Sequence, residues 1–248
     1  MQNKIIYGVP FSQPVRAVMW LMLIKKFPFE LKLTNPGSSS EGGSRHPDYL
    51  KKFPTGTIPS FEDPETGLLI SESHAIMCYL CNTNNWNDLY PSNPEQRAKV
   101  DSYLHLHHRN VREASICLVA PKVRKDLNFS EDFLEASKAS IEKAFKAIET
   151  GWLHNSKFLI GDTMTIADIS AYVEIGQLQS IFTNIYNFGP FPNIQKWLNE
   201  MQNVDCHDDI HTALYELGDI SKEAPPMEVI INANKKAFQV IQEKLNNM

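Results

Sequence analysis

The sequence predicts an α/β domain of βαβ-ββα order followed by an all-helical domain. Three observations predict this fold class. Strand-like and helix-like segments alternate over the first eighty residues, asparagines and prolines gather at 82–94, and strand signals nearly vanish beyond that stretch. We therefore predict a domain at 1–81, a linker at 82–94 and a second domain at 95–248.

The first βαβ unit is marked by hydrophobic periodicity. Lys4–Tyr7 is a short predicted strand that ends at Gly8, and Pro14 lies where the first turn of a helix tolerates proline. The helix that follows has apolar residues at helical spacing, namely Val15, Val18, Met19, Met22 and Leu23. Phe29–Leu33 alternates apolar and polar residues, as a half-buried strand does.

The second half of this domain begins with a loop rich in Gly, Ser and Asn at 35–44 and a short helix at 47–52. Pro59 heads an apolar run, a place where a strand needs no N–H donor. The turn at 63–67 has the form Asp-Pro-x-x-Gly and joins that run to a second strand at 68–70, which predicts a hairpin.

Glu72 and Ser73 follow the hairpin and open a segment with apolar residues at helical spacing. A strand that leads into a helix N-terminus presents free N–H groups and the positive end of the helix dipole, which favour an anion. Glu72 beside them suits an ammonium group. Together the two residues suit the α-amino and α-carboxylate groups of an amino-acid head group.

Beyond the linker the chain predicts helices. The segments are 95 to about 120, 131 to about 152, one that begins near 166, 193–201 and 228–245. We therefore expect the second domain to be all-helical.

Composition narrows the classes of function. The chain has 248 residues, 42% of them hydrophobic, and a formal net charge of −5, which argues against nucleic acid as a main partner. Apolar runs fall short of the roughly 20 residues that span a bilayer, and Met1–Lys4 leads into a strand without the apolar region of a signal peptide. Four cysteines are too few for a disulfide framework, so a reducing compartment, the cytoplasm, is expected.

The loop after the first strand is the place where a thioredoxin-like fold carries its reactive group. A βαβ unit, a proline that opens the third strand and a strand-to-helix anion site predict this arrangement. The loop, Phe11–Arg16, has no cysteine, which excludes thiol–disulfide exchange by a protein thiol there. Ser12 offers a hydrogen-bond donor. Two simpler interpretations stay open: Ser12 is only an N-cap, and Glu72 with Ser73 is only a helix start.

Three further motifs receive structural interpretations. Cys78 and Cys81 lie inside an apolar helix and are predicted core residues. The histidines at 105, 107 and 108 point to different faces of a helix, so we predict solvent or interface positions and no metal site. Thr165–Asp168 has the form of a capping box.

Four phrases of the sequence carry a resemblance to a known family, namely Phe11–Val18, Gly56–Phe61, Ser71–Ile76 and Leu89–Pro91. They occur in the same order in cytosolic glutathione transferases, and the chain resembles that family. The Ser-Gln-Pro-x-Arg-Ala-Val phrase resembles the theta class in particular, as does Arg97–Leu104 followed by His108 and Arg112. The resemblance covers nearly the whole chain and is densest from Lys4 to Arg112.

The resemblance implies a role for individual residues. Ser12 would donate to the glutathione sulfur, and Arg112 would project toward it from the first long helix of the second domain. Ile58 would be the backbone partner of the glutathione cysteine, directly before a cis Pro59. Glu72 and Ser73 would hold the γ-glutamyl head group, as their chemistry alone suggests.

Two positions depart from the family pattern. Theta members tend to have a histidine and a lysine at the glycine end of glutathione, and the aligned residues here are Ser44 and Thr57. Gln13, Arg45 or His46 would compensate.

The resemblance also implies the chemistry. A glutathione thiolate attacks an electrophilic carbon or a peroxide, with peroxidase or dehalogenase side activity and a role in detoxification. The electrophile pocket would lie between the domains, with 225–248 as its lining or cover, and a homodimer would close the open side. Two alternatives remain: a non-catalytic module of the same fold for binding or partner docking, and a reductase or isomerase, whose chemistry usually needs a cysteine in the Ser12 loop.

Overall fold

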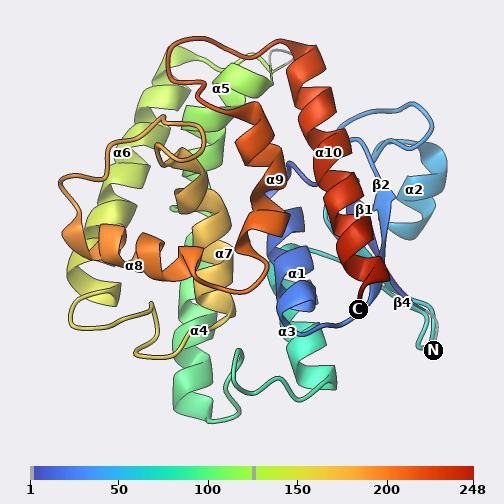
Figure 1. Ribbon diagram of the computed structural model, residues 1–248, viewed down its shortest axis with the longest axis horizontal. Helices are drawn as coiled ribbons and strands as arrows, with labels where there is room; N and C mark the ends of the chain where they lie inside the picture. The colour runs from blue at the N-terminus through green and yellow to red at the C-terminus, as the bar shows by residue number, and fades with distance from the viewer. Residues whose placement is uncertain (1–2, 125–126) are drawn as a thin grey trace. The chain divides into compact units, whose positions relative to one another are not determined.

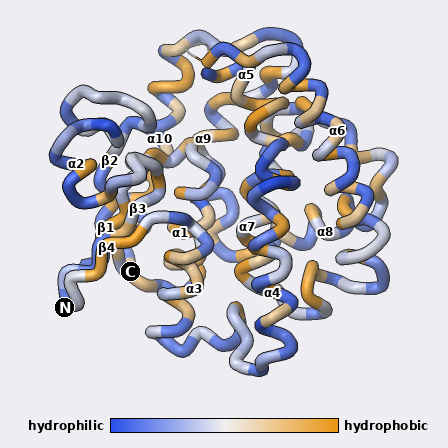
Figure 2. Tube along the Cα trace, turned by 180° about the vertical axis from the view of Figure 1, so that it is seen from behind, coloured by the Kyte–Doolittle hydropathy of each residue, from blue (hydrophilic) through white to orange (hydrophobic). Residues whose placement is uncertain are grey.

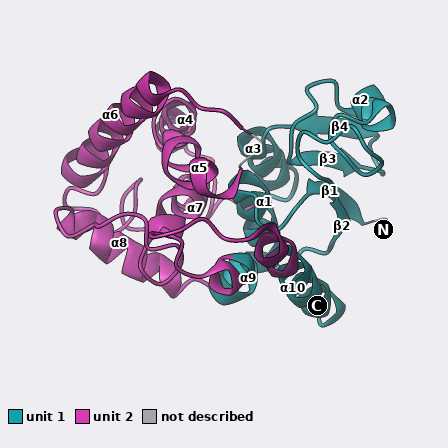
Figure 3. Ribbon diagram, turned by 90° about the horizontal axis from the view of Figure 1, so that it is seen from above, with its two compact units in different colours: residues 1–85, 205–213, 234–248 teal, residues 86–204, 214–233 magenta. Residues whose placement is uncertain are grey.

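The computed structural model describes residues 3–124 and 127–248; Met1 and Gln2, the first residues of the predicted domain at 1–81, lie outside the described residues. The chain divides into two compact units, coloured in Figure 3. Unit 1 consists of Met1–Asn85, Asp205–Ala213 and Asn234–Met248, and unit 2 consists of Trp86–Val204 and Leu214–Ala233.

Unit 1 is built on a four-stranded mixed sheet with the strand order β2-β1-β3-β4. β1 runs parallel to β2 and antiparallel to β3, and β3 runs antiparallel to β4. Its N-terminal elements follow one another as β1 (Lys4–Gly8), α1 (Gln13–Ile24), β2 (Phe29–Leu33), α2 (Pro47–Lys52), β3 (Ser60–Asp63), β4 (Leu68–Ser71) and α3 (Ser73–Thr83) (Figure 1). The predicted βαβ-ββα order is confirmed.

Helices cover both faces of this sheet. Ile5 and Tyr7 of β1 share one cluster of buried residues with Tyr49 of α2 and with Phe53, which follows that helix directly. Side chains alternate along a strand, so Ile6 points to the opposite face, where it has no exposed surface. α1 and α3 pack against each other on that second face (Figure 3). The inner strand β1 is mostly hydrophobic and the outer helix α2 is mostly hydrophilic (Figure 2).

Unit 2 is helical. Its elements are α4 (Pro94–His107), the π-helix η1 (Ser115–Val119), α5 (Ala120–Val123), α6 (Glu131–Ala147), the π-helix η2 (Ile148–Trp152), α7 (Ile166–Ile175), the 3₁₀ helix η3 (Gly176–Leu178) and α8 (Pro192–Gln202). α7 is buried along its whole length and packs against α4 and α8. The predicted capping box is confirmed: Thr165 and Asp168 form it at the start of α7, and Asp168 also accepts from Trp197 Nε1 at 3.0 Å.

The last two helices are α9 (His207–Leu217) and α10 (Met227–Asn246). The helix predicted at 228–245 is confirmed, whereas α9 was not predicted. Residues 205–213 and 234–248 group with unit 1, and the predicted domain boundaries stay a prediction. A hydrogen bond from Trp20 Nε1 to the Asp205 carbonyl oxygen, 2.9 Å long, contributes to this grouping. Such a contact joins residues far apart in the chain and leaves no local pattern in the sequence.

The single helix predicted from 95 to about 120 is wrong in its extent. α4 ends at His107, and turns at 108–112 separate it from η1. The side-chain amide of Asn110 donates to the Leu106 carbonyl oxygen at 2.9 Å and so takes over a bond that a continuing helix would make. Arg112 therefore follows this helix and does not lie on it. Within residues 3–124 and 127–248, no helix has the length and apolar character needed to cross a membrane.

Candidate active site

The Ser12 loop begins where β1 ends. Gly8 closes the strand, and a β-carbon there would lie 2.5 Å from the Val15 side chain, so only glycine allows α1 to approach so closely. The Ser12 N–H then donates to the Val9 carbonyl oxygen at 3.0 Å, which forms a tight turn. This turn places Ser12 at the N-cap position of α1, with φ −69° and ψ 124°.

The Ser12 hydroxyl is not used as a cap. Within the described chain, the side chain makes no capping hydrogen bond to α1, although the backbone has N-cap geometry. The interpretation of Ser12 as a helix cap alone therefore lacks its characteristic contact. The half-buried hydroxyl lies at the positive end of a twelve-residue helix, where an anion is favoured.

Strand register brings three loop segments to one edge of the sheet. Tyr7 of β1 pairs with Ser60 of β3, and Ser60 pairs with Ser71 of β4. Because both pairs are antiparallel, the chain after Tyr7, the chain before Ser60 and the chain after Ser71 all leave the sheet at the same edge. These segments carry Ser12, the loop that ends at Pro59, and Glu72 with Ser73. The sequence prediction placed the same residues in one site without this register.

Hydroxyl groups connect two of these segments. The Oγ atoms of Ser60 and Ser71 lie 2.7 Å apart, and the Oγ1 atoms of Thr55 and Thr57 lie 3.0 Å apart. The Tyr49 hydroxyl donates to the Thr57 carbonyl oxygen at 2.6 Å. These bonds fix the loop that leads to Pro59, so Thr57 is an exposed residue on a restrained backbone.

The loop ends in the Ile58–Pro59 peptide bond, which is cis, as the resemblance implies. Pro59 is buried, and Ile58 packs against the cluster of Tyr7, Tyr49 and Phe53. The Ile58 backbone is thus held directly before β3.

Glu72 has an unusual backbone. Its φ of 77° lies in the region that favours glycine, and its ψ is 114°. Holding a non-glycine residue there costs on the order of 1–3 kcal/mol, and such strain is concentrated at ligand sites and switches. Glu72 is exposed, whereas Ser73 is buried in the first turn of α3. The strained residue therefore offers its carboxylate to solvent at the start of a helix.

α3 is fixed in place by a buried ion pair. Lys4 Nζ lies 2.7 Å from Asp63 Oδ1, and the Tyr79 hydroxyl of α3 donates to Asp63 Oδ2 at 2.7 Å. Burial alone would raise the pKa of Asp63, but the hydrogen bonds from Lys4, Tyr79 and the Glu65 amide lower it to about 2. The carboxylate is therefore ionised at any physiological pH and joins β1, β3 and α3.

The structure places the residues predicted at the glycine end of glutathione in different environments. Ser44 has no exposed surface, and its Oγ accepts from the Gly37 N–H at 2.9 Å. Direct contact between the Ser44 side chain and a ligand would therefore require this loop to rearrange. Arg45 is exposed, and its Cδ and Nη1 atoms lie 3.0 Å from where a β-carbon on Gly56 would stand. Arg45 is thus next to the Thr57 loop.

The two other residues predicted near the glycine end, His46 and Gln13, lie at the N-terminal ends of helices. His46 is the N-cap of α2, where its ring accepts from the Asp48 N–H at 3.3 Å. Gln13 is 8% exposed in the first turn of α1. Gln13 follows Ser12 directly and stays a candidate for the same edge.

Arg112 belongs to unit 2 and forms an ion pair with Glu174. Glu174 is 1% exposed, and it also accepts a hydrogen bond from the Ser115 hydroxyl. The Gln177 side chain donates in turn to Ser115 Oγ at 2.8 Å. The positive charge of Arg112 is therefore balanced by a buried carboxylate, and its predicted role near the sulfur stays a prediction.

Sequence reasoning assigned no role to Arg16. Its side chain has no exposed surface, and Nη1 donates to the Phe11 carbonyl oxygen at 2.5 Å. A fully buried guanidinium one turn after Ser12 adds positive charge near the helix N-terminus. A charged residue within an otherwise apolar helical stretch was the signal that could have found it.

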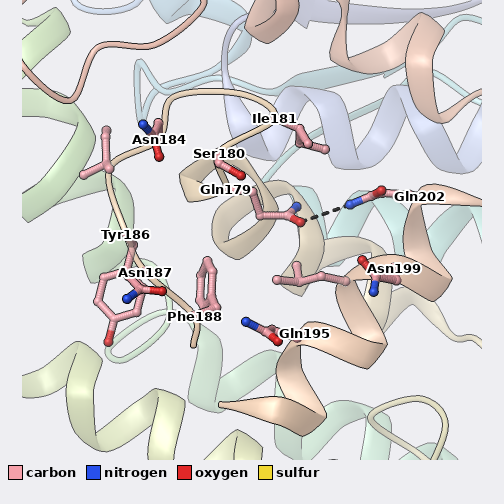
Figure 4. Close-up of a pocket in the computed structure, with 12 residues that line it drawn as sticks. Gln179, Ser180, Ile181, Asn184, Tyr186, Asn187, Phe188, Gln195, Asn199 and Gln202 are labelled. Carbon is pink, nitrogen blue, oxygen red and sulfur yellow. Dashed lines mark hydrogen bonds between the residues drawn. The ribbon is translucent and has the colours of Figure 1, made fainter. Parts of the chain in front are cut away.

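Unit 2 contains a cavity of about 570 Å³ (Figure 4). Six carboxamide side chains line it, namely Gln179, Asn184, Asn187, Gln195, Asn199 and Gln202, and none of the described lining residues is charged. Gln202 Nε2 donates to Gln179 Oε1 at 3.0 Å, the bond drawn in Figure 4.

Metal chemistry has no candidate among the described residues. No group of three or more histidine, cysteine, aspartate or glutamate side chains in 3–124 and 127–248 is placed to hold an ion. His105 and His108 are exposed, as predicted, but His107 is 4% exposed and lies within 3.4 Å of the Tyr103 hydroxyl, so the prediction of a solvent or interface position for it is wrong.

Comparison with known families identifies the chain. The model described as "Glutathione S-transferase, N-terminal domain" matches residues 6–88, and "Glutathione S-transferase, C-terminal domain" matches residues 110–205. The chain belongs to the glutathione S-transferase family. The two matches cover the Ser12 loop, the Pro59 loop, the start of α3 and Arg112.

Individual relatives extend the resemblance. Glutathione S-transferase T3 of Arabidopsis thaliana is 26% identical over 96% of this chain and 42% of its own length. Glutathione S-transferase theta-1 of Homo sapiens is 25% identical over 89% of this chain and 90% of its own length. The structure of the Bombyx mori glutathione transferase BmGSTD1 has a TM-score of 0.73 and 26% identity, with 97% of this chain and 98% of that chain covered.

These relatives confirm the predicted resemblance to glutathione transferases, theta members among them. The chain spans about two fifths of the length of the T3 and T2 relatives from Arabidopsis thaliana.

Proposed function

We propose that this glutathione transferase is theta-like and uses the Ser12 hydroxyl to stabilise the glutathione thiolate. The observation that carries the proposal is the register of Tyr7, Ser60 and Ser71, which brings the Ser12 turn, the Pro59 loop and Glu72–Ser73 to one edge of the sheet. A tripeptide with an amino-acid head group and a thiol matches the functional groups at this edge.

The electrostatic task is to ionise a thiol at neutral pH. A free cysteine thiol has a pKa of about 8.5, and lowering it by two pH units requires about 2.7 kcal/mol. The Ser12 hydroxyl, the N-terminus of α1 and the buried Arg16 guanidinium all favour the anion. Arg112 is the fourth group in the proposal, through its predicted position near the sulfur.

The ends of glutathione have separate candidates. Glu72 and Ser73 would hold the γ-glutamyl ammonium and carboxylate, and the Ile58 backbone, before Pro59, would pair with the cysteine residue. Arg45, exposed beside Gly56, is the cation for the glycine carboxylate, with Gln13, His46 and Thr57 as neighbours.

The reaction is then a nucleophilic displacement. The thiol proton passes to solvent, the thiolate sulfur forms a bond to an electrophilic carbon, and the leaving group departs with its electron pair. An alkyl halide would give dehalogenation, with halide as the leaving group. With a hydroperoxide, the thiolate sulfur would attack the terminal oxygen, the O–O bond would break and the alkoxide would leave with a proton from solvent; a second glutathione would reduce the resulting sulfenic acid to the disulfide and water, which gives peroxidase activity. We also propose a cytoplasmic homodimer with a role in detoxification.

A non-catalytic binding or docking module is the second candidate. One observation favours it: Ser44 is buried and Thr57 is uncharged, where theta members tend to have a histidine and a lysine. Retention on immobilised glutathione without turnover of a small alkyl halide or a hydroperoxide would select this alternative.

The variant Ser12→Ala tests the catalytic proposal. A hydrogen bond to a charged acceptor contributes roughly 1.5–3 kcal/mol, so turnover should fall about 10- to 150-fold. The glutathione KM should stay within about threefold, because the bond strengthens only as the thiol ionises. Steady-state kinetics with an alkyl halide measure both values.

The exposed residue Ser92 provides the matched control, since Ser92→Ala removes the same hydroxyl far along the sequence from this edge. Turnover of Ser12→Ala equal to that of Ser92→Ala would refute the role of Ser12.

A further inference from the structure

We propose that Asn234 of the C-terminal helix is a positioning residue for Ser12. Its side chain holds the N–H of Phe11, the residue directly before Ser12, and the proposal rests on the function proposed for that serine. Both residues belong to unit 1, although they are more than two hundred positions apart in the chain.

The turn at Val9–Ser12 leaves one residue with both backbone groups available. Its internal bond joins the Ser12 N–H to the Val9 carbonyl oxygen, and Pro10 has no N–H to offer. The third residue of the turn, Phe11, therefore has an N–H and a carbonyl oxygen that the turn itself does not use.

Two side chains take these groups. Asn234 Oδ1 accepts from the Phe11 N–H at 3.0 Å, and Arg16 Nη1 donates to the Phe11 carbonyl oxygen at 2.5 Å. One partner comes from α1 and the other from α10. The backbone that leads into Ser12 is therefore held from two directions, which restricts the orientation of the Ser12 hydroxyl.

Asn234 is itself held by the helix that carries it. Ala237 and Ile241 follow at helical spacing on the same side of α10, and each is 1% exposed. One turn later Lys244 Nζ lies 2.8 Å from Asp209 Oδ2 of α9. The contact of Asn234 with Phe11 thus continues a buried stripe along the C-terminal half of α10. The packing of this stripe holds the side-chain amide of Asn234 in place.

The alternative role of this contact is only to dock α10. The docking role and the positioning role predict different results. A docking role changes stability alone. A positioning role changes the ionisation and reactivity of bound glutathione, because a displaced hydroxyl no longer points at the sulfur. A purely structural variant would leave the pKa of the bound thiol unchanged.

The experiment compares Asn234→Ala, Asn234→Asp and Asn232→Ala in the full chain. Asn232 lies on the same helix and is exposed, so its alanine variant is the matched control. Asp keeps an acceptor oxygen for the Phe11 N–H and is the conservative rescue. The three readouts are hydrogen exchange of the Phe11 amide by NMR, kcat against glutathione KM, and the pKa of bound glutathione from thiolate absorbance.

We expect Asn234→Ala to speed Phe11 amide exchange at least about tenfold. It should lower kcat at least about fivefold with KM within twofold, and raise the bound-thiol pKa by about half a pH unit. Asn234→Asp should keep slow exchange and a kcat within about threefold of wild type, and Asn232→Ala should change nothing.

Unchanged Phe11 exchange in Asn234→Ala would overturn the contact. Faster exchange with an unchanged kcat and thiol pKa would overturn the positioning role and leave a docking contact. These failures are distinct from failure of the proposed function, which would show as full turnover in Ser12→Ala. If Asn234→Ala does not fold, Asn234→Asp and Asn234→Ser are compared by the same readouts, and equal kinetics with a different Phe11 exchange rate would overturn the proposal.

Discussion

The buried carboxylate of Asp63 allows a prediction whose magnitude comes from the structure. Asp63 is 3% exposed and accepts from Lys4 Nζ, the Tyr79 hydroxyl and the Glu65 N–H. The fall of its pKa from 3.8 to about 2 corresponds to about 2.4 kcal/mol of stability at pH 7. The variant Asp63→Asn should lose about this amount, because the amide resembles the protonated acid.

The sign of the pH dependence follows from the direction of the shift. The pKa in the folded state lies below the unfolded value, so the stabilisation is complete above about pH 5 and is lost as the pH falls through 2. The difference between wild type and Asp63→Asn should therefore shrink to about 1.3 kcal/mol at pH 3. Urea unfolding followed by circular dichroism at pH 7 and pH 3 measures both values.

Asp48 provides a control with the same geometry and a different environment. Its Oδ1 also lies 2.7 Å from a lysine Nζ, that of Lys51, but both side chains are about three-quarters exposed. Asp48→Asn should change stability little, because solvent screens such a pair. Equal losses in Asp48→Asn and Asp63→Asn, or a loss in Asp63→Asn that is the same at pH 7 and pH 3, would refute this reasoning.

Three further predictions concern the proposed site and assembly. Glu72→Gln should weaken binding of S-hexylglutathione by about 1–3 kcal/mol in calorimetric titration, and an unchanged affinity would place the head group elsewhere. Gly56→Ala should cost more thermal stability than Gly67→Ala, because both have positive φ but only a β-carbon at Gly56 meets Arg45; equal melting temperatures would contradict this. The protein should sediment at twice the 28.3 kDa chain mass at about ten micromolar, and a monomer there would reject the homodimer.

Local elements were largely predictable because their causes lie within a few residues. The strand at 29–33 and the helix at 47–52 agree with the structure at both ends, and the 63–67 turn forms where Asp-Pro-x-x-Gly predicts it. The predicted helix from 95 to 120 failed where a side chain competes with the backbone: Asn110 takes the Leu106 carbonyl oxygen. The spacing of apolar residues carries no information about a single hydrogen bond that competes with the helix.

The sequence predicted which residues belong to the candidate site, but it did not predict how they are arranged in space. Ser12, Pro59 and Glu72 stand out in the sequence because each residue type suits its local position and chemistry. Ser44 was chosen by alignment alone, and its burial depends on how the 35–44 loop folds back on itself, as the bond to Gly37 shows.

The sequence by itself determined the order of the strands and helices up to α3, the absence of a cysteine from the Ser12 loop and the residue types at the edge of the sheet. Only the tertiary structure decided that Tyr7, Ser60 and Ser71 lie in register, and that Arg16 binds the Phe11 carbonyl oxygen while Asn234 binds the Phe11 N–H. Turn and helix preferences act over a few residues, whereas register and side-chain contacts depend on chain segments brought together by burial of apolar surface. A contact between positions 11 and 234 therefore has no signature in either local sequence.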